Sequence, residues 1–219
     1  MIRAICFDMD GTLLDTEMLW AKAVEQYLND AGAPVSRESA IDIMYGRSWT
    51  DCHALVREQL GSRELALETL KEELRKRFHV LLETSEIRIP NSITLLKALA
   101  KDFPVCVVSG SYADDVANGI RIAGIKGDIK FYLGDEHYAP GKPAPACYLH
   151  AAERLGVRPE ECLVFEDSEE GIHAAKDAGM HCVALAVPGR PKQDTSRADM
   201  TLDDLGKFSI DALQEIIGG

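Results

Sequence analysis

Two aspartates stand two residues apart near the start of the chain, in the stretch FDMDGTLLDTE that runs from Phe7 to Glu17. In an extended chain, side chains two residues apart point the same way, so the Asp8 and Asp10 carboxylates would share one face. Paired carboxylates can attack an electrophile, move protons or bind a cation. Gly11 follows directly and allows the backbone to turn where a side chain would hinder it.

Other residues of chemical interest follow later apolar runs. Ser109 closes the run PVCVVS, Glu166 closes the run CLVFE, and Asp167 follows it directly. Lys142 lies in the loop PGKPAP at 140–145. If these runs are strands of one parallel sheet, ligands bind at their carboxyl ends, and the scattered residues would converge there with the two aspartates.

Each piece has a simpler interpretation when it is taken alone. The stretch DMDG could belong to a calcium-binding EF-hand loop, because Gly11 and Glu17 have the right spacing. Cys6 would then occupy the obligatory first aspartate position, and the flank is strand-like rather than helical, which excludes this interpretation.

The remaining pieces could equally be local structure. Ser109–Ser111 could cap a helix, Lys142 could be a solvated loop residue, and Glu166 with Asp167 could favour a helix N-terminus through its dipole. Only their ordered combination indicates a single site.

The elements that must position these residues alternate along the chain. Five short apolar runs are expected to be strands, at 2–7, 104–109, 129–133, 162–166 and 182–187. Helical periodicity separates the later ones, at 92–100, 113–123, 145–155 and 169–178. This pattern predicts an α/β fold with a doubly wound, Rossmann-like parallel sheet covered by helices on both faces.

Residues 16–87 interrupt this rhythm. They contain no strand-like run, and helical spacing is clear in Leu65, Leu70, Leu74, Phe78, Leu81 and Leu82. We therefore expect two domains, an α/β catalytic core formed by 1–15 plus 88–219 and an all-helical insertion at 16–87.

Composition limits the binding partners and the compartment that can be expected for this protein. The chain has 219 residues and a formal net charge of −12, which argues against a nucleic acid or an anionic membrane as partner. Six widely spaced cysteines without a CxxC pair indicate reduced, buried thiols. With no signal-like segment and no long apolar run, we expect a cytoplasmic protein, and we expect it to be a monomer.

The four stretches FDMDGTLLDT, VVSGS, GKPAP and FEDSEEG resemble the four motifs of the haloacid dehalogenase superfamily in sequence and order. The helical insertion is similar to the small cap of the subgroup that contains β-phosphoglucomutase and sugar-phosphate phosphatases. The resemblance covers nearly the whole chain and implies phosphoryl transfer. The second aspartate, Asp10, distinguishes the chain from the carbon–halogen dehalogenases of that superfamily.

The resemblance also implies roles for the acidic residues. Asp8 would be the nucleophile that forms an aspartyl phosphate, and Asp10 would be the acid and base. The cofactor would be Mg²⁺, with the Asp8 carboxylate, the Asp10 backbone carbonyl and Asp167 as ligands and with Glu166 nearby or acting through water.

The phosphoryl oxygens would be held by Ser109, by the amide of Gly110 and by Lys142. The substrate would be a small phosphorylated metabolite, a sugar or polyol phosphate.

The cap decides between two activities. Transfer to water makes a phosphatase, whereas transfer to a sugar hydroxyl makes a β-phosphoglucomutase-type mutase. In GRSWTD at 46–51, Trp49 stands where the mutases are expected to carry an arginine, which favours the phosphatase. Arg47 could recognise the polar end of the substrate or could be solvated. Trp20 and Trp49 could line a sugar pocket, although packing within the cap is the simpler interpretation.

Overall fold

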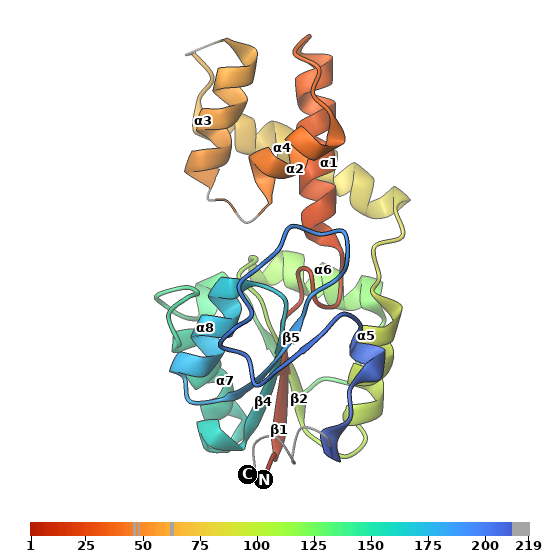
Figure 1. Ribbon diagram of the computed structural model, residues 1–219, viewed down its shortest axis with the longest axis vertical. Coiled ribbons are helices and arrows are strands. Elements are labelled where there is room, and N and C mark those ends of the chain that lie inside the picture. Colours follow the sequence, from red (N-terminus) through yellow and green to blue (C-terminus); the bar gives the residue numbers. More distant parts are fainter. Residues whose placement is uncertain (46, 48, 62–63, 212–219) are drawn as a thin grey trace. The chain divides into compact units, whose positions relative to one another are not determined.

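The computed structural model describes residues 1–45, 47, 49–61 and 64–211 (Figure 1). The chain divides into two compact units. One comprises Met1–Leu14 and the chain from Arg88 onward, and the other comprises Asp15–Ile87. Each unit is described by itself below.

The first unit is built on a six-stranded parallel sheet with the strand order β3-β2-β1-β4-β5-β6. Its strands are β1 (Ala4–Phe7), β2 (Val105–Val108), β3 (Phe131–Leu133), β4 (Cys162–Glu166), β5 (His181–Leu185) and β6 (Met200–Leu202). The predicted doubly wound parallel sheet is confirmed, and five strands fall on the five apolar runs. The sixth, β6, was not predicted, because it has three residues and none of them is fully buried.

The sheet is buried because helices cover it. Every residue of β1, β2 and β4 is buried, as expected for parallel strands with both faces covered. In Figure 1, α7 (Ala146–Leu155) and α8 (Glu169–Asp177) lie on one side of the sheet and α5 (Pro90–Leu99) on the other. The remaining long helix of this unit is α6 (Ala113–Ala123).

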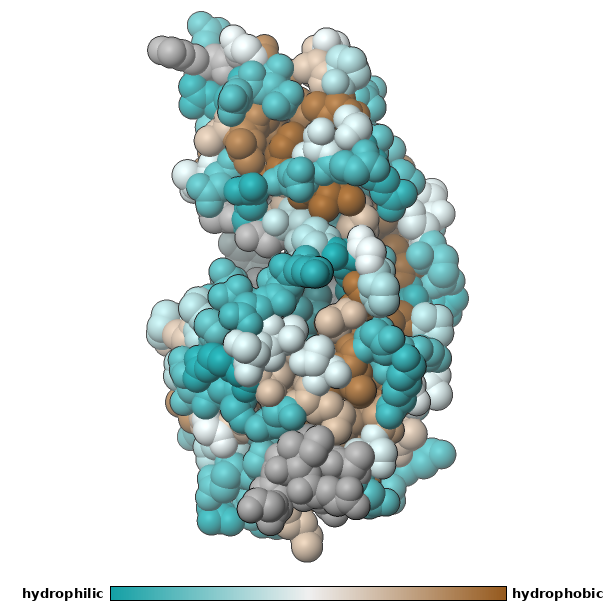
Figure 2. All heavy atoms as spheres, viewed as in Figure 1, coloured by the Kyte–Doolittle hydropathy of each residue, from teal (hydrophilic) through white to brown (hydrophobic). Residues whose placement is uncertain are grey.

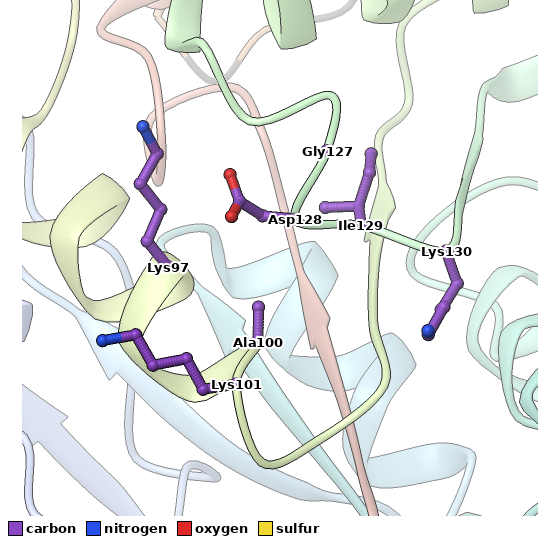
Figure 3. Close-up of a pocket in the computed structure, with 7 residues that line it drawn as sticks. All are labelled: Lys97, Ala100, Lys101, Gly127, Asp128, Ile129 and Lys130. Atoms are coloured by element: carbon purple, nitrogen blue, oxygen red, sulfur yellow. The ribbon is translucent and has the colours of Figure 1, made fainter.

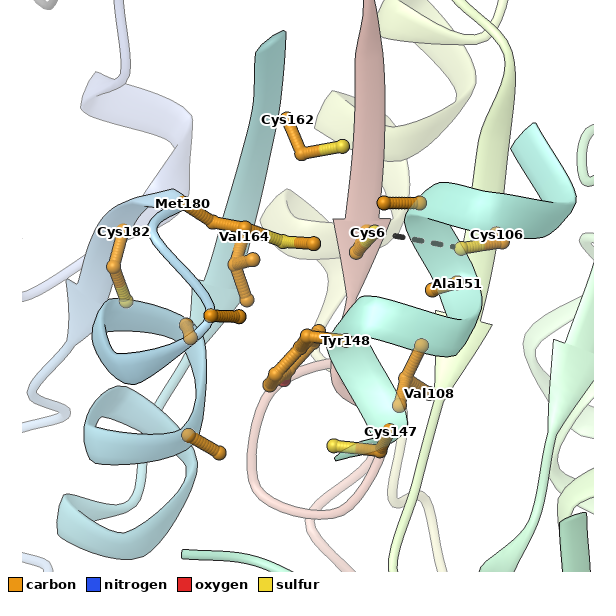
Figure 4. Close-up of a cluster of buried hydrophobic side chains, with 14 of the residues drawn as sticks. Cys6, Cys106, Val108, Cys147, Tyr148, Ala151, Cys162, Val164, Met180 and Cys182 are labelled. Atoms are coloured by element: carbon orange, nitrogen blue, oxygen red, sulfur yellow. Dashed lines mark hydrogen bonds between the residues drawn. The ribbon is translucent and has the colours of Figure 1, made fainter. Parts of the chain in front are cut away.

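A core rich in cysteine fills the space between the sheet and helices α7 and α8 (Figure 4). Cys6 and Cys106 are directly paired across β1 and β2, and their sulfur atoms are 3.5 Å apart. All six cysteines are free and buried, which agrees with the prediction of reduced thiols. Burial raises the pKa of Cys147 to about 11, so this thiol stays protonated near neutral pH.

In its described residues the second unit consists of helices and their connections, with α1 (Thr16–Asp30), α2 (Arg37–Met44), α3 (Trp49–Leu60) and α4 (Leu67–Thr84). The apolar stripe predicted for its last helix is buried at four positions, Leu70, Leu74, Phe78 and Leu81. The ring of Trp20 stacks on Phe78 at 4.1 Å and meets Trp49 edge-on at 5.2 Å. The two tryptophans therefore pack against each other inside this unit.

Hydrophilic side chains spread over much of the surface in Figure 2, with hydrophobic ones gathered in smaller groups. Among the residues that the structure describes, no helix combines the length and the apolar character needed to cross a membrane.

Candidate active site

The site lies where three neighbouring strands end. β1 pairs with β2 on one side and with β4 on the other, with Phe7 opposite both Val107 and Phe165. Residues that directly follow these strands are therefore brought together at one edge of the sheet. Since the strand order runs outward in both directions from β1, this edge is the position at which doubly wound sheets bind ligands.

Asp8 lies buried at the centre of this edge, with 4% of its surface exposed. Lys142 reaches it from the loop before α7. The lysine Nζ donates to Asp8 Oδ1 at 2.7 Å and to Glu166 Oε1 at 2.6 Å. Two buried carboxylates close together would repel, and the ammonium group between them offsets that repulsion.

The pKa values of Asp8 and Lys142 reflect burial on one side and the attraction between their opposite charges on the other. Burial raises the pKa of Asp8, the Glu166 carboxylate raises it further, and Lys142 opposes both. Burial alone would lower the pKa of Lys142, but the carboxylates of Asp8 and Glu166 raise it well above its usual value. Lys142 is therefore a permanent positive charge in the site.

Five hydrogen bonds hold the Glu166 carboxylate. Besides the lysine, the buried Tyr148 hydroxyl donates to Oε1 at 3.0 Å. Oε2 accepts from the backbone N–H groups of Asp167 and Ser168 and from the Ser168 hydroxyl, at 3.0–3.2 Å. Gly171 in α8 leaves room for this carboxylate, since a Cβ there would stand 1.7 Å from Oε1. The arrangement fixes Glu166 in one position.

Three carboxylates suit a hard cation. One oxygen each of Asp8, Glu166 and Asp167 can be chosen so that all lie within 4.8 Å of one another. Among the described residues, Asp8 Oδ2 is buried without a hydrogen-bond partner, which is costly unless a ligand completes it. Oxygen donors in this number fit Mg²⁺. Gly11, with φ at +87°, brings the turn against Asp167, where a Cβ would stand 2.0 Å from Oδ2.

The Asp10 carboxylate has different partners from that of Asp8. The hydroxyls of Ser109 and Ser111 donate to Asp10 Oδ2 at 2.7 and 2.9 Å. The alternation that predicted a shared direction applies within a strand, and β1 ends at Phe7, before both aspartates. Asp10 is not among the three grouped carboxylates, and its predicted metal contact through the backbone carbonyl stays a prediction.

The predicted phosphate-binding residues lie at the same edge. Ser109 is buried, its hydroxyl accepts from the backbone N–H of Ser111 at 3.0 Å, and its carbonyl accepts from the Tyr138 hydroxyl at 2.7 Å. Gly110 follows it and is exposed, with no heavy atom within 4 Å of where a Cβ would stand. Lys142 completes the predicted set.

The sequence did not point to several residues that contact the site, among them Ser111, Tyr138, Tyr148 and Arg190. The tyrosines and the arginine lie outside the strand ends, in or near helices and in a long connection, so no positional rule selected them. Ser111 was recognised only as part of a helix cap.

Arg47 belongs to the other unit. It is exposed, and its Nε donates to the carbonyl of Asp42 at 2.5 Å. Its neighbours Gly46 and Ser48, which belong to the segment compared with the mutases, lie outside the described residues. The predicted contact of Arg47 with substrate stays a prediction.

A cavity of about 260 Å³ opens elsewhere in the first unit (Figure 3). Its lining comes from the end of α5 and from the segment before β3, and it includes Lys97, Lys101, Asp128 and Lys130. These segments precede β2 and β3, so they lie toward the amino ends of the strands, whereas the acidic residues lie at the carboxyl ends. The cavity is separate from the site.

Comparison with known proteins decides the family. The profile of the haloacid dehalogenase-like hydrolases matches residues 2–179. This chain belongs to that family. The resemblance predicted from the four motifs is confirmed, and so is the enzyme class, because curated relatives of the chain are named phosphatases.

One relative is a probable pseudouridine-5'-phosphatase of Drosophila melanogaster, 33% identical over 92% of this chain and 89% of its own. The fructose-1-phosphate phosphatase of Escherichia coli is 30% identical over 84% of this chain and 96% of its own. Among solved structures, a family hydrolase of Deinococcus radiodurans with bound phosphate and sodium has a TM-score of 0.81 and 27% identity. That likeness covers 98% of this chain and 96% of the other.

Proposed function

We propose that this protein is an Mg²⁺-dependent phosphatase of small phosphorylated metabolites, sugar or polyol phosphates, that works through an aspartyl phosphate on Asp8. One observation carries the proposal. Asp8 is buried with one oxygen held by Lys142, while its other oxygen lacks a hydrogen-bond partner among the described residues. A carboxylate in this state can attack phosphorus directly, without first breaking a hydrogen bond to that oxygen.

In the first step, an Asp8 oxygen bonds to phosphorus while the bond from phosphorus to the leaving oxygen breaks. Asp10 gives its proton to that leaving oxygen, so the product departs as an alcohol. Lys142 and the Ser109 hydroxyl spread the charge on the phosphoryl oxygens. In the structure, the Ser109 hydroxyl donates its single proton to Asp10. When substrate binds, this hydroxyl would donate to a phosphoryl oxygen instead.

In the second step, water attacks the phosphorus of the aspartyl phosphate and Asp10 takes the proton of that water. The bond between phosphorus and Asp8 breaks, and the carboxylate is restored. Ser111 also donates to Asp10, and it can keep this side chain in place after Ser109 has turned to the phosphoryl group.

Asp8, through the oxygen that does not attack phosphorus, and Asp167 would hold Mg²⁺, with the Asp10 carbonyl as a third ligand. When bound, the ion would shield the approaching phosphate from the carboxylates and polarise a phosphoryl oxygen. Glu166 would not bind the ion directly, because its oxygens already accept hydrogen bonds from five donors. Its role would be to hold Lys142 in place.

The names of the relatives support the substrate class. They include enzymes for fructose 1-phosphate and glycerol 3-phosphate, and the Deinococcus structure binds phosphate. We propose that the Asp15–Ile87 unit is the cap that selects among such substrates, with Arg47 as a candidate contact. The described residues offer no contact that favours the alternative of a sugar phosphomutase. We further propose a cytoplasmic monomer.

The test is release of inorganic phosphate from a panel of hexose, pentose, polyol and two-carbon phosphates, with Mg²⁺ and with EDTA. We expect release concentrated on a few substrates, abolished by EDTA and absent in Asp8→Asn. Release that continues in EDTA would refute the metal dependence, and release by Asp8→Asn would refute the nucleophile. Conversion of glucose 1-phosphate to glucose 6-phosphate without phosphate release would establish the mutase instead.

A further inference from the structure

Arg190 joins the site from a segment that carries no family motif, the connection between β5 and β6. Its Nη1 donates to the carbonyl of Gly11 at 2.6 Å and lies 3.8 Å from Asp167 Oδ2. Only 10% of the side chain is exposed. An arginine that is held this deeply, 179 residues away in sequence from its backbone acceptor, is built into the site rather than solvated.

Arg190, Gly11 and Asp167 form a single contact group. The Gly11 turn touches Asp167 so closely that a Cβ would stand 2.0 Å from Oδ2. The Thr12 hydroxyl lies 3.4 Å from the other oxygen of Asp167. Because Gly11 is one residue after Asp10, a guanidinium that fixes the Gly11 carbonyl also fixes the turn that carries the catalytic carboxylates.

Among the described residues, Lys142 and Arg190 are positive groups that face the carboxylates of the site. Lys142 contacts Asp8 and Glu166, and Arg190 faces Asp167. A divalent ion that binds Asp8 and Asp167 therefore approaches the Asp167 carboxylate while the Arg190 guanidinium already lies beside it. The arginine lowers the repulsion among carboxylates when no ion is bound, and it repels the ion when one arrives.

We propose that Arg190 is a positioning residue that clamps the Gly11 turn and acts as a resident positive charge beside Asp167. This inference rests on the proposed function, since it takes Asp167 to be a ligand of Mg²⁺. It predicts that the charge and the clamp affect different measured quantities. Removing the charge tightens Mg²⁺ binding, whereas removing the clamp slows turnover.

Two variants separate these effects. Arg190→Gln removes the charge and the clamp. Arg190→Lys keeps the charge but carries it on a shorter side chain, whose ammonium group reaches less far toward the Gly11 carbonyl than Nη1 of the arginine does. Arg197→Gln is the matched control, because Arg197 lies on the same connection and pairs with Asp177 at 2.6 Å on the surface.

The measurements are Mg²⁺ affinity by titration calorimetry, the unfolding midpoint in EDTA, and kcat and KM with the best substrate of the panel. For Arg190→Gln we expect about fivefold tighter Mg²⁺ binding, within the usual range of coupling between two sites. We also expect a midpoint in EDTA about 2–4 °C lower and kcat about tenfold lower, with KM within twofold. For Arg190→Lys we expect an unchanged Mg²⁺ affinity and a lower kcat, and for Arg197→Gln no change.

Unchanged or weaker Mg²⁺ binding in Arg190→Gln would overturn the inference, and so would an equal effect of Arg197→Gln. If Arg190→Gln does not fold, Arg190→Lys still decides, because an unchanged kcat in that variant refutes the clamp. Wild-type protein that neither binds Mg²⁺ nor releases phosphate would refute the proposed function itself. An active, Mg²⁺-binding wild type with an unaffected Arg190→Gln variant would refute only the role of Arg190.

Discussion

Replacing Gly171 by alanine tests whether the acidic site is as tightly packed as its geometry indicates. Gly171 lies in α8, where alanine is intrinsically favoured over glycine by about 1 kcal/mol. The added Cβ would, however, stand 1.7 Å from Glu166 Oε1 and 2.0 Å from its carboxyl carbon. Helix propensity and packing therefore predict opposite signs for the change in stability.

The magnitude follows from the bonds that Glu166 would lose. To reach an ordinary contact distance the carboxyl group must move by more than 1 Å, which breaks the 2.6 Å bond from Lys142 and the 3.0 Å bond from Tyr148. A hydrogen bond to a charged group contributes about 1.5–3 kcal/mol. Two such bonds contribute about 3–6 kcal/mol, so after the gain of about 1 kcal/mol in helix propensity we expect Gly171→Ala to lower the free energy of unfolding by about 2–5 kcal/mol.

For a chain of this size, 1 kcal/mol corresponds to about 2–4 °C in the unfolding midpoint, so the expected fall is about 4–20 °C. Thermal unfolding followed by circular dichroism in EDTA measures it. Gly127→Ala is the matched control, because no heavy atom lies within 4 Å of the added Cβ and the backbone φ is not positive. A Gly171→Ala protein that unfolds at or above the wild-type temperature would refute the packing of Glu166 described above.

Three further predictions concern single residues. Asp10→Asn should slow both formation and hydrolysis of the phosphoenzyme in single-turnover kinetics, and unchanged rates would exclude it as acid and base. Lys142→Met removes the positive charge between the buried carboxylates of Asp8 and Glu166, so the free energy of unfolding in EDTA should fall by about 3–5 kcal/mol and turnover should be lost. Burial lowers the pKa of His181, so the unfolded chain binds its proton more readily and stability should fall as the pH drops below 6.5. In His181→Gln the free energy of unfolding should fall less between pH 7.5 and 5.5 than in the wild type. An equal fall in both proteins would show that His181 is not its cause.

The sequence was sufficient for the parts of the site that follow strand ends. The apolar runs before Asp8, Ser109 and Asp167 are buried throughout, so they could be recognised as central strands, and a parallel sheet must bring their carboxyl ends together. The same reasoning failed for β6, whose three residues, two partly buried and one exposed, carry little hydrophobic signal.

Side-chain partners beyond the strand ends could not be predicted in the same way. Arg190 reaches Gly11 from a long connection whose path depends on tertiary packing, and Tyr148 reaches Glu166 only because α7 lies across the sheet. The different partners of Asp10 and Asp8 were also missed, because strand alternation no longer governs residues after Phe7.

The most direct test of the proposed mechanism is to locate the phosphoryl group on the enzyme. The protein would be mixed with Mg²⁺ and its best substrate, quenched in acid within milliseconds, digested, and mapped by peptide mass spectrometry. We predict a phosphoryl group on Asp8 that disappears as turnover ends and is absent in Asp8→Asn. Phosphate release without any phosphopeptide, or with the phosphoryl group on Asp10 or another residue, would contradict the assignment of Asp8 as the nucleophile.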